Sequence, residues 1–412
     1  MKKIYTGLLL LLMLSLTACK RVSVTEEHHQ LKNIACQNFG SSFVLPQQAI
    51  VKPLKNSLTR EEAFELAVAN NRMLQAQLQD IGIAKADLIQ AGLYTNPLFA
   101  IVSNMPFQKN NSANYSITTS FALADLWQTP LREKIFYAQV QTAVYQMVQN
   151  ILEIKVQVRK AYDAALYASN QLEQALESEQ ELKRQIGLPK ERHDASAALA
   201  RADLDVEAAQ LKVTTACITL YTILGIDTFA QPTVFTDILE VIYPIVSLET
   251  LYCWALESRP ELAAARWKIE QYKATVTYEK VRIVKDVNMG FSYAQDFTRN
   301  TGFGPEFDTH VPLFDQNQSA IARSRFLLEK SLCEYDALQL KIKAEVCQNY
   351  KTLMSTYKQI DVYKNQILPG YKAPVHKTSK QDAHNKLTEI YYNAQTVFAD
   401  LERAVGRTIR VN

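Results

Sequence analysis

Two stretches of this sequence, residues 131–186 and 313–368, contain neither glycine nor proline. They are equal in length, and each is several times longer than an average helix of about 11–12 residues. Because glycine and proline commonly mark helix ends, we expect one long helix in each stretch. At a rise of about 1.5 Å per residue, such a helix would extend about 84 Å. That length exceeds the core of a compact domain and favours a rod or a tube.

The two stretches occupy matching positions in an internal duplication, which is the sequence signature of repeat architectures. Each copy has the order helix, two strands, long helix, turn and helix. Matching residues are 188 positions apart as far as Tyr350 and 181 positions apart at the end, so the second copy has lost seven residues after Tyr350. The matches include Leu58-Thr59 with Val246-Ser247, Leu74 with Leu262, Tyr162 with Tyr350, and Leu224-Gly225 with Val405-Gly406.

The helices carry recognisable signals. Thr59-Arg60-Glu61-Glu62 is a capping-box pattern, and we expect the first helix to run to about Leu93. The long helix from about Pro130 has an apolar stripe whose steps mostly alternate between three and four residues, which is a coiled-coil seam. The second copy repeats this stripe from Ile342 to Ile367.

Leu98–Phe107 is a less clearly patterned candidate strand. Three further segments alternate between apolar and small or polar residues with period two, which predicts strands. In the last of them, Phe303 and Phe307 share one face, whereas Glu306, Asp308 and His310 share the other. We expect strands at about 97–107, 114–124, 287–296 and 302–313.

These strands have the length of tilted transmembrane β-strands. Four strands cannot close a barrel, and lipid does not tolerate open sheet edges. Two copies would supply eight strands and a filled interior, whereas three would supply twelve and leave a lumen. The alternative is a soluble, coiled-coil lipoprotein capped by two hairpins, but the strand pattern argues against it. The predicted fold class is therefore mainly α with a β-barrel contribution, in which duplicated units form a trimeric tube.

The N-terminus has the features of a bacterial lipoprotein signal. Lys2 and Lys3 precede a short apolar core, and Leu16–Cys19 resembles the lipidation motif. On this interpretation Cys19 becomes the mature N-terminus and carries palmitate or related acyl chains; an ordinary signal peptide is the alternative. Lys20 then favours the outer membrane.

These observations divide the chain into consecutive segments. We predict a signal peptide at 1–18, a lipid-anchored linker at 19–57, a first repeat at 58–225, a linker at 226–245, a second repeat at 246–406 and a tail at 407–412.

Composition and motifs exclude several function classes. With 45 Lys+Arg against 42 Asp+Glu, the chain lacks the excess positive charge expected of a nucleic-acid binder. No GxSxG, HExxH or phosphate-binding glycine loop occurs, so we expect neither an enzyme nor a cofactor nor a bound metal. His28-His29 are interpreted as solvated. Five cysteines remain after Cys19; we interpret them as mostly buried, with one disulfide among the alternatives.

The duplicated pattern resembles the TolC-type outer-membrane efflux protein family over about residues 55–410. The residues that carry the resemblance are the paired helix starts Leu58–Ala63 and Ser247–Leu251, Asn96-Pro97, Gly304-Pro305, Val311–Gln318 and the ending Leu401–Gly406.

The resemblance implies a homotrimer with a 12-stranded barrel in the outer membrane and a helical tube in the periplasm. Its implied function is export of small solutes or metal cations, in a tripartite efflux system with a periplasmic adaptor protein and an inner-membrane pump. Pro312–Gln318 is similar to the heavy-metal resistance branch, with drugs or other small organic molecules as the alternative cargo. Glu306, Asp308 and His310 would then face the pore and form a weak cation path.

The sequence departs from the family at the periplasmic tips. The first turn matches only partly at Asp194–Ala202, and the second, near Pro374–Gln381, has lost its glycine. Asp382-Ala383 resembles the tip motif whose acidic side chains narrow the pore, although Asp382 is also readable as a solvated helix residue. Because the tip is where family members close and where the adaptor docks, the alternative function is a non-conducting structural or interaction lipoprotein derived from an efflux duct.

Overall fold

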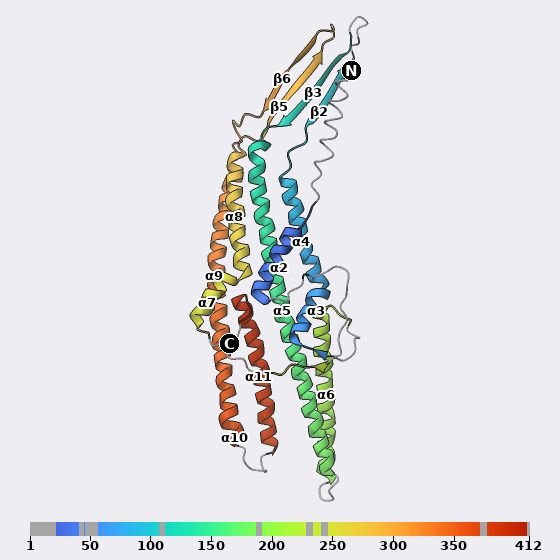
Figure 1. Cartoon of the computed structure of the whole chain (residues 1–412), viewed down its shortest axis with the longest axis vertical. Coiled ribbons are helices and arrows are strands. Elements are labelled where there is room, and N and C mark those ends of the chain that lie inside the picture. Colours follow the sequence, from blue (N-terminus) through green and yellow to red (C-terminus); the bar gives the residue numbers. More distant parts are fainter. Residues whose placement is uncertain are drawn as a thin grey trace. The chain divides into compact units, whose positions relative to one another are not determined.

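The computed structural model describes residues 22–40, 45, 57–105, 107, 112–186, 192–227, 234–239, 246–370 and 377–409 (Figure 1). Most of them lie in helices, and the predicted fold class, mainly α with a contribution from a sheet, is confirmed for the single chain. The helices are α2 (Thr25–Phe39), α3 (Arg60–Asn70), α4 (Arg72–Ala91), α5 (Asp125–Ile186), α6 (Arg192–Leu224), α7 (Leu248–Ser258), α8 (Pro260–Val281), α9 (Gln318–Val362), α10 (Leu368–Gly370) and α11 (Lys377–Val405). The strands are β1 (Ser57–Leu58), β2 (Leu98–Asn104), β3 (Asn114–Ala122), β4 (Val234–Phe235), β5 (Val287–Gln295) and β6 (Thr301–Thr309).

The chain forms two compact units, and each draws on both sequence repeats. Of the described residues, the first unit contains 22–26, 80–144 and 263–336, and the second contains the others. Units and repeats differ because the hairpins of the two repeats pair with each other in one sheet.

That sheet belongs to the first unit and has the order β2-β3-β5-β6, with every neighbouring pair antiparallel. β3 pairs with β5, for example Ile117 opposite Tyr293, and so joins the two hairpins. The strands begin within one residue of the predicted starts, but β2 ends at Asn104 and β6 at Thr309, before the predicted ends at 107 and 313. β6 stops where its partner begins, because Thr309 pairs with Val287, the first residue of β5. Leu313 N then donates to Val311 O in a turn.

The long helices bury the predicted seams. In α5 the buried members include Val148, Ile151, Val158 and Ala165, and in α9 they include Ile342, Val346, Leu353 and Ile360. α5 begins at Asp125, before the predicted start at Pro130. The Asp125 carboxylate accepts from Thr95 N at 2.6 Å and lies 3.2 Å from Arg132 Nη2, which fixes the first turn of the helix.

The second unit contains a helix break that occurs once in each repeat. The predicted helix from Thr59 to Leu93 is interrupted at Asn71, whose backbone is extended. Asn71 Oδ1 accepts from Leu74 N, so its side chain caps α4, and Asn71 Nδ2 donates to Ile223 O. The second repeat breaks in the same way at Arg259, between α7 and α8.

The N-terminal segment also differs from expectation. Residues 19–57 were expected to be a linker, but α2 forms within them and buries Leu31 and Ala35. An amphipathic face at a spacing of four residues accounts for this helix. His28 lies on α2 and is half-buried, and burial lowers its pKa.

The cysteine prediction is wrong with respect to burial. Cys253 and Cys333 are exposed, and the remaining three described cysteines are intermediate. All five are free thiols.

Candidate functional site

The sheet of the first unit has one apolar face that is open to solvent. Phe291 on β5 and Phe303 on β6 stack with centroids 5.8 Å apart and rings within 1° of parallel. Phe303 is 74% exposed and Phe99 is 65% exposed. By the register, the same face carries Phe99, Ile101, Ile117, Phe121, Met289, Phe291, Tyr293, Phe303 and Phe307. An exposed apolar surface of this kind marks a contact with lipid or protein.

The opposite face is lined by small and polar residues on β3, β5 and β6, whereas β2 adds Leu98 and Val102 to it. It carries Ser116, Thr118, Ser120, Asn288, Gly290, Ser292, Gly304, Glu306 and Asp308. Gly290 is required by close packing, because a Cβ there would lie 2.2 Å from Thr119 O. The period-two pattern of the sequence therefore corresponds to two chemically different faces.

Glu306 and Asp308 lie together on this polar face, as the sequence predicts. Asp308 Oδ2 accepts from Asn288 Nδ2 at 3.4 Å. His310 was expected to share the strand, but it follows the end of β6, and its Nδ1 lies 3.6 Å from Asp286 Oδ2. Within the described ranges, no group of three or more His, Cys, Asp or Glu residues is placed to hold a metal ion.

Asp382 lies on α11 in the second unit, and its side chain is exposed. With Asn385 and Lys386 it lines a groove of about 500 Å³, whose other walls come from α5, including Gln171, and from α6, including Lys212. Lys386 is ion-paired with Glu389 at 2.7 Å. The turn at residues 371–376 and Cys19 lie outside the described residues.

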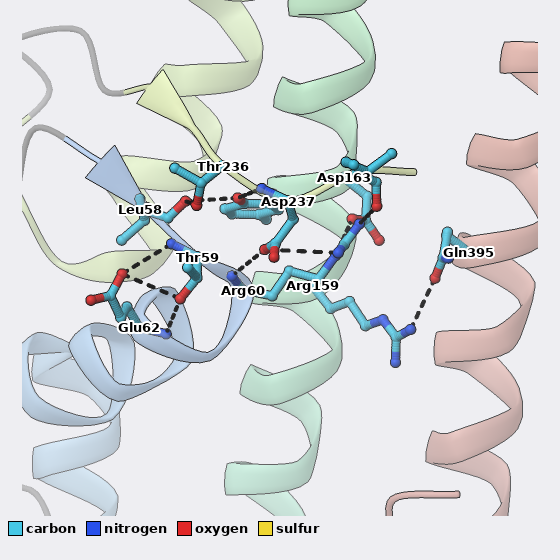
Figure 2. A network of polar contacts seen from close by, with 11 residues as sticks. Leu58, Thr59, Arg60, Glu62, Arg159, Asp163, Thr236, Asp237 and Gln395 are labelled. Atoms are coloured by element: carbon cyan, nitrogen blue, oxygen red, sulfur yellow. Dashed lines mark hydrogen bonds and ion pairs between the residues drawn. The ribbon is translucent and has the colours of Figure 1, made fainter. Parts of the chain in front are cut away.

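A polar network in the second unit was not anticipated from the sequence (Figure 2). Its centre is Arg60, at the start of α3. Arg60 Nε donates to Asp163 Oδ1 on α5 at 2.7 Å, and Arg60 N donates to Asp237 Oδ2 at 2.7 Å. The capping box predicted at Thr59 is present, with Glu62 as its partner. The network thus fixes residues 236–238 and the N-terminus of α3 against α5.

Asp163 is the most buried charge of this network. Its side chain is fully buried, and its Oδ2 has no hydrogen-bond partner among the described residues. Burial raises the pKa of Asp163, although the neighbouring Arg60 opposes the shift. The adjacent Tyr162 donates to Leu58 O at 2.7 Å, and burial raises its pKa to about 12.

A second arm of the network joins α5 to α11. Arg159 Nη2 donates to Gln395 Oε1 at 2.9 Å (Figure 2). Arg159 Nη1 also lies 2.5 Å from Glu402 Oε2. The Arg159 guanidinium also lies over the Phe398 ring at 5.0 Å. Both arms depend on residues of α5 that are four positions apart, Arg159 and Asp163, and so lie one helical turn from each other.

Among the described residues, no helix combines the length and the apolarity needed to cross a membrane.

The fold, with its duplicated helix-hairpin-helix units and shared four-stranded sheet, is that of the TolC-type outer-membrane channels. Among solved structures the chain is similar to CusC, whose structures describe transmembrane channel formation. The TM-score is 0.69 at 14% identity, covering 89% of this chain and 99% of that chain. It is also similar to the outer-membrane channel OprN, with a TM-score of 0.67 at 15% identity over 90% of this chain and 99% of that chain.

The open state of the MtrE outer membrane channel of Neisseria gonorrhoeae gives a TM-score of 0.62 at 14% identity, covering 89% of this chain and 97% of that one. No protein-family model and no curated protein sequence matches the chain. The shared feature is therefore the fold.

Proposed function

We propose that this chain is the outer-membrane channel component of a tripartite efflux system, which exports small solutes or metal cations from the periplasm. The observation that carries the proposal is the sheet of the first unit. One face is apolar and exposed, and the other is small and polar on β3, β5 and β6. The two edge strands, β2 and β6, each pair with only one described strand. In lipid such edges must be paired, because unpaired backbone groups cost several kcal/mol each.

Pairing between copies of the chain satisfies both edges. Because the strands alternate in direction, β6 of one copy and β2 of the next are antiparallel and continue the sheet. Three copies close a barrel of twelve strands that leaves a lumen. On this arrangement the apolar face contacts lipid, and the polar face, with Glu306 and Asp308, lines the pore.

The family resemblance of the sequence supports the partners of this channel, an adaptor protein in the periplasm and a pump in the inner membrane. It also supports anchoring through an acylated Cys19. Mass spectrometry of the mature N-terminus tests the anchor. An acylated cysteine is expected, whereas an unmodified terminus at another residue contradicts it.

Conductance tests the proposed function itself. Full-length protein, purified in detergent, should have the native mass of three chains and should give single-channel currents in a planar lipid bilayer. The non-conducting alternative predicts trimers without currents. A stable monomer that retains the full strand content contradicts the channel proposal altogether.

The cargo is tested separately. Deletion of the gene should sensitise cells to the exported class, either metal cations or small organic molecules, and restoring the chain should reverse the effect. Sensitivity to organic molecules alone would exclude the cation proposal.

A further inference from the structure

A cavity of about 610 Å³ lies in the second unit, next to the network of Figure 2. Its walls come from five segments distant in sequence: α3, α5, residues 236–238, α11 and residues 408–409. Phe64, Phe398, Ile238 and Ile409 supply apolar wall, and Arg60, Lys155 and Arg159 supply positive charge. A concave site that combines apolar walls with a few convergent polar groups has the character of a ligand site.

The three cations of the wall are not equally neutralised. Arg60 is ion-paired with Asp163 and Asp237. Arg159 is ion-paired with Glu402, which also accepts from Ile409 N at 2.9 Å. These contacts give both guanidinium groups a carboxylate partner, although Arg159 Nε has no hydrogen-bond partner among the described residues.

Lys155 is different, because its hydrogen bonds are to uncharged oxygens. Its ammonium donates to Thr408 Oγ1 at 2.8 Å and to Phe39 O at 3.3 Å. No carboxylate of the described residues lies within ion-pair distance of it. An ammonium has three donors, so one remains for a ligand. The amine also lies over the rings of Phe39 and Phe64, at 5.8 and 5.6 Å.

We propose that this cavity binds a small monoanionic ligand, namely a carboxylate with an apolar body. The carboxylate pairs with the Lys155 ammonium, and the apolar body lies against Phe64 and Phe398. A charge-assisted hydrogen bond of this type is among the stronger polar contacts available in a protein. Glu61, Asp237 and Glu402 also line the cavity, and their negative charges disfavour a ligand with two negative charges more than a ligand with one.

The burial of Lys155 is consistent with this role. Burial lowers the pKa of Lys155, although the nearby Glu402 and Glu61 carboxylates oppose the shift. A bound carboxylate would add a counter-charge at contact distance. The ligand would also connect the end of α2, the C-terminal residues 408–409 and α5, which meet at this amine.

Fluorine NMR of para-fluorobenzoate, added to the full chain in detergent, tests the proposal. Two other ligands are compared with it: para-fluorobenzamide, which is uncharged, and a fluorophthalate, which has two negative charges. The third comparison is binding of para-fluorobenzoate to the Lys155→Gln variant. Gln keeps a donor for Phe39 O and Thr408 but removes the charge. We expect the affinity in each comparison to be about tenfold or more below that of para-fluorobenzoate for the unaltered chain, because hydrogen bonds to charged groups contribute more than neutral ones.

Lys160→Gln is the matched control. Lys160 lies on the same helix and is ion-paired with Asp400 at 2.7 Å, outside the cavity. The Lys160→Gln variant should bind para-fluorobenzoate with the same affinity as the unaltered chain. Equal binding of the benzamide, unchanged binding by Lys155→Gln, or a Kd above about 10 mM for the unaltered chain would each overturn the proposal. The benzamide comparison needs no variant and holds even if Lys155→Gln fails to fold.

Discussion

The carbonyl oxygen of Asn70 lies 2.7 Å from the position that a Cβ would take at Gly225. Gly225 ends α6 with φ +68, and Asn70 ends α3. The second repeat has the same relationship, because a Cβ at Gly406, φ +82, would lie 2.9 Å from Cα of Arg259. In both repeats a left-handed glycine thus allows a helix end to pack against a helix break, and Arg259 Nη1 adds a hydrogen bond to Ala404 O at 2.8 Å.

Gly225→Ala should destabilise the second unit. The left-handed backbone and the contact with Asn70 O both oppose a side chain, and strain of this kind costs about 1–3 kcal/mol. The free energy of unfolding, measured from helix content in guanidinium, is expected to fall by that amount. Gly370→Ala is the control, because nothing lies within 4 Å of a Cβ there. An equal effect of the two substitutions would contradict the explanation.

Asp163→Asn should change how stability depends on pH. Burial raises the folded-state pKa of Asp163, so the folded chain holds this proton more tightly than the unfolded chain. Its contribution is fully present below the ordinary Asp pKa of about 3.9 and is lost as pH rises through the raised folded-state pKa. As pH rises through this range, the free energy of unfolding of the unaltered chain should therefore fall relative to that of Asp163→Asn. Denaturant titrations at several pH values measure it; a difference that is constant with pH would refute the prediction.

Phe291→Asp should hinder insertion or trimer assembly. Phe291 lies on the apolar face of the sheet, and an acidic residue facing lipid costs about 2 kcal/mol or less. The expected result is a lower yield of trimer in the outer-membrane fraction. Ser292→Asp, one position along the same strand, faces the polar side and should assemble normally. Normal assembly of Phe291→Asp together with impaired assembly of Ser292→Asp would show that the other face of the sheet contacts lipid.

Asp382→Ala tests whether Asp382 belongs to the pore. If three copies surround the axis, their carboxylates favour cations over anions in the pore. The variant should then show weaker cation selectivity and weaker block by divalent ions in bilayer recordings. Asp361→Ala, on α9, is the comparison. Equal selectivity of Asp382→Ala and the unaltered channel would remove Asp382 from the pore and leave the channel proposal unaffected.

Local periodicity explains which parts of the fold could be predicted from the sequence. The period-two pattern around Phe303 and the seam through Val158 are repeated over successive residues, so sequence alone reveals them. The capping box at Thr59 is equally local. The end of β6 is not local, because the alternation continues past Thr309 whereas the ladder stops where β5 begins at Val287.

The network around Arg60 could not be predicted in this way. Arg60 and Asp163 are 103 positions apart in the sequence, and neither stands in a motif. Asp163 lies beside the apolar stripe of α5, and its charge at that position is the only sequence feature that could have indicated a buried polar contact. The break at Asn71 has a weak signal in the pair Asn70-Asn71, since Asn is a favoured N-cap residue.

The seven residues missing from the second repeat have a consequence for its helical hairpin. Both arms shorten equally, because α5 ends 24 residues after Tyr162 whereas α10 ends 20 residues after Tyr350, and α6 has 33 residues whereas α11 has 29. Four residues are about one helical turn, so each arm loses a whole turn and the two arms can still face each other. In the second repeat the helix also passes into a π-helix at Tyr363–Ile367, whereas α5 remains α-helical to Ile186. Because a π-turn closes over one residue more than an α-turn, the residues after Ile367 lie on a different side of the helix from the one that continues the apolar seam of α9.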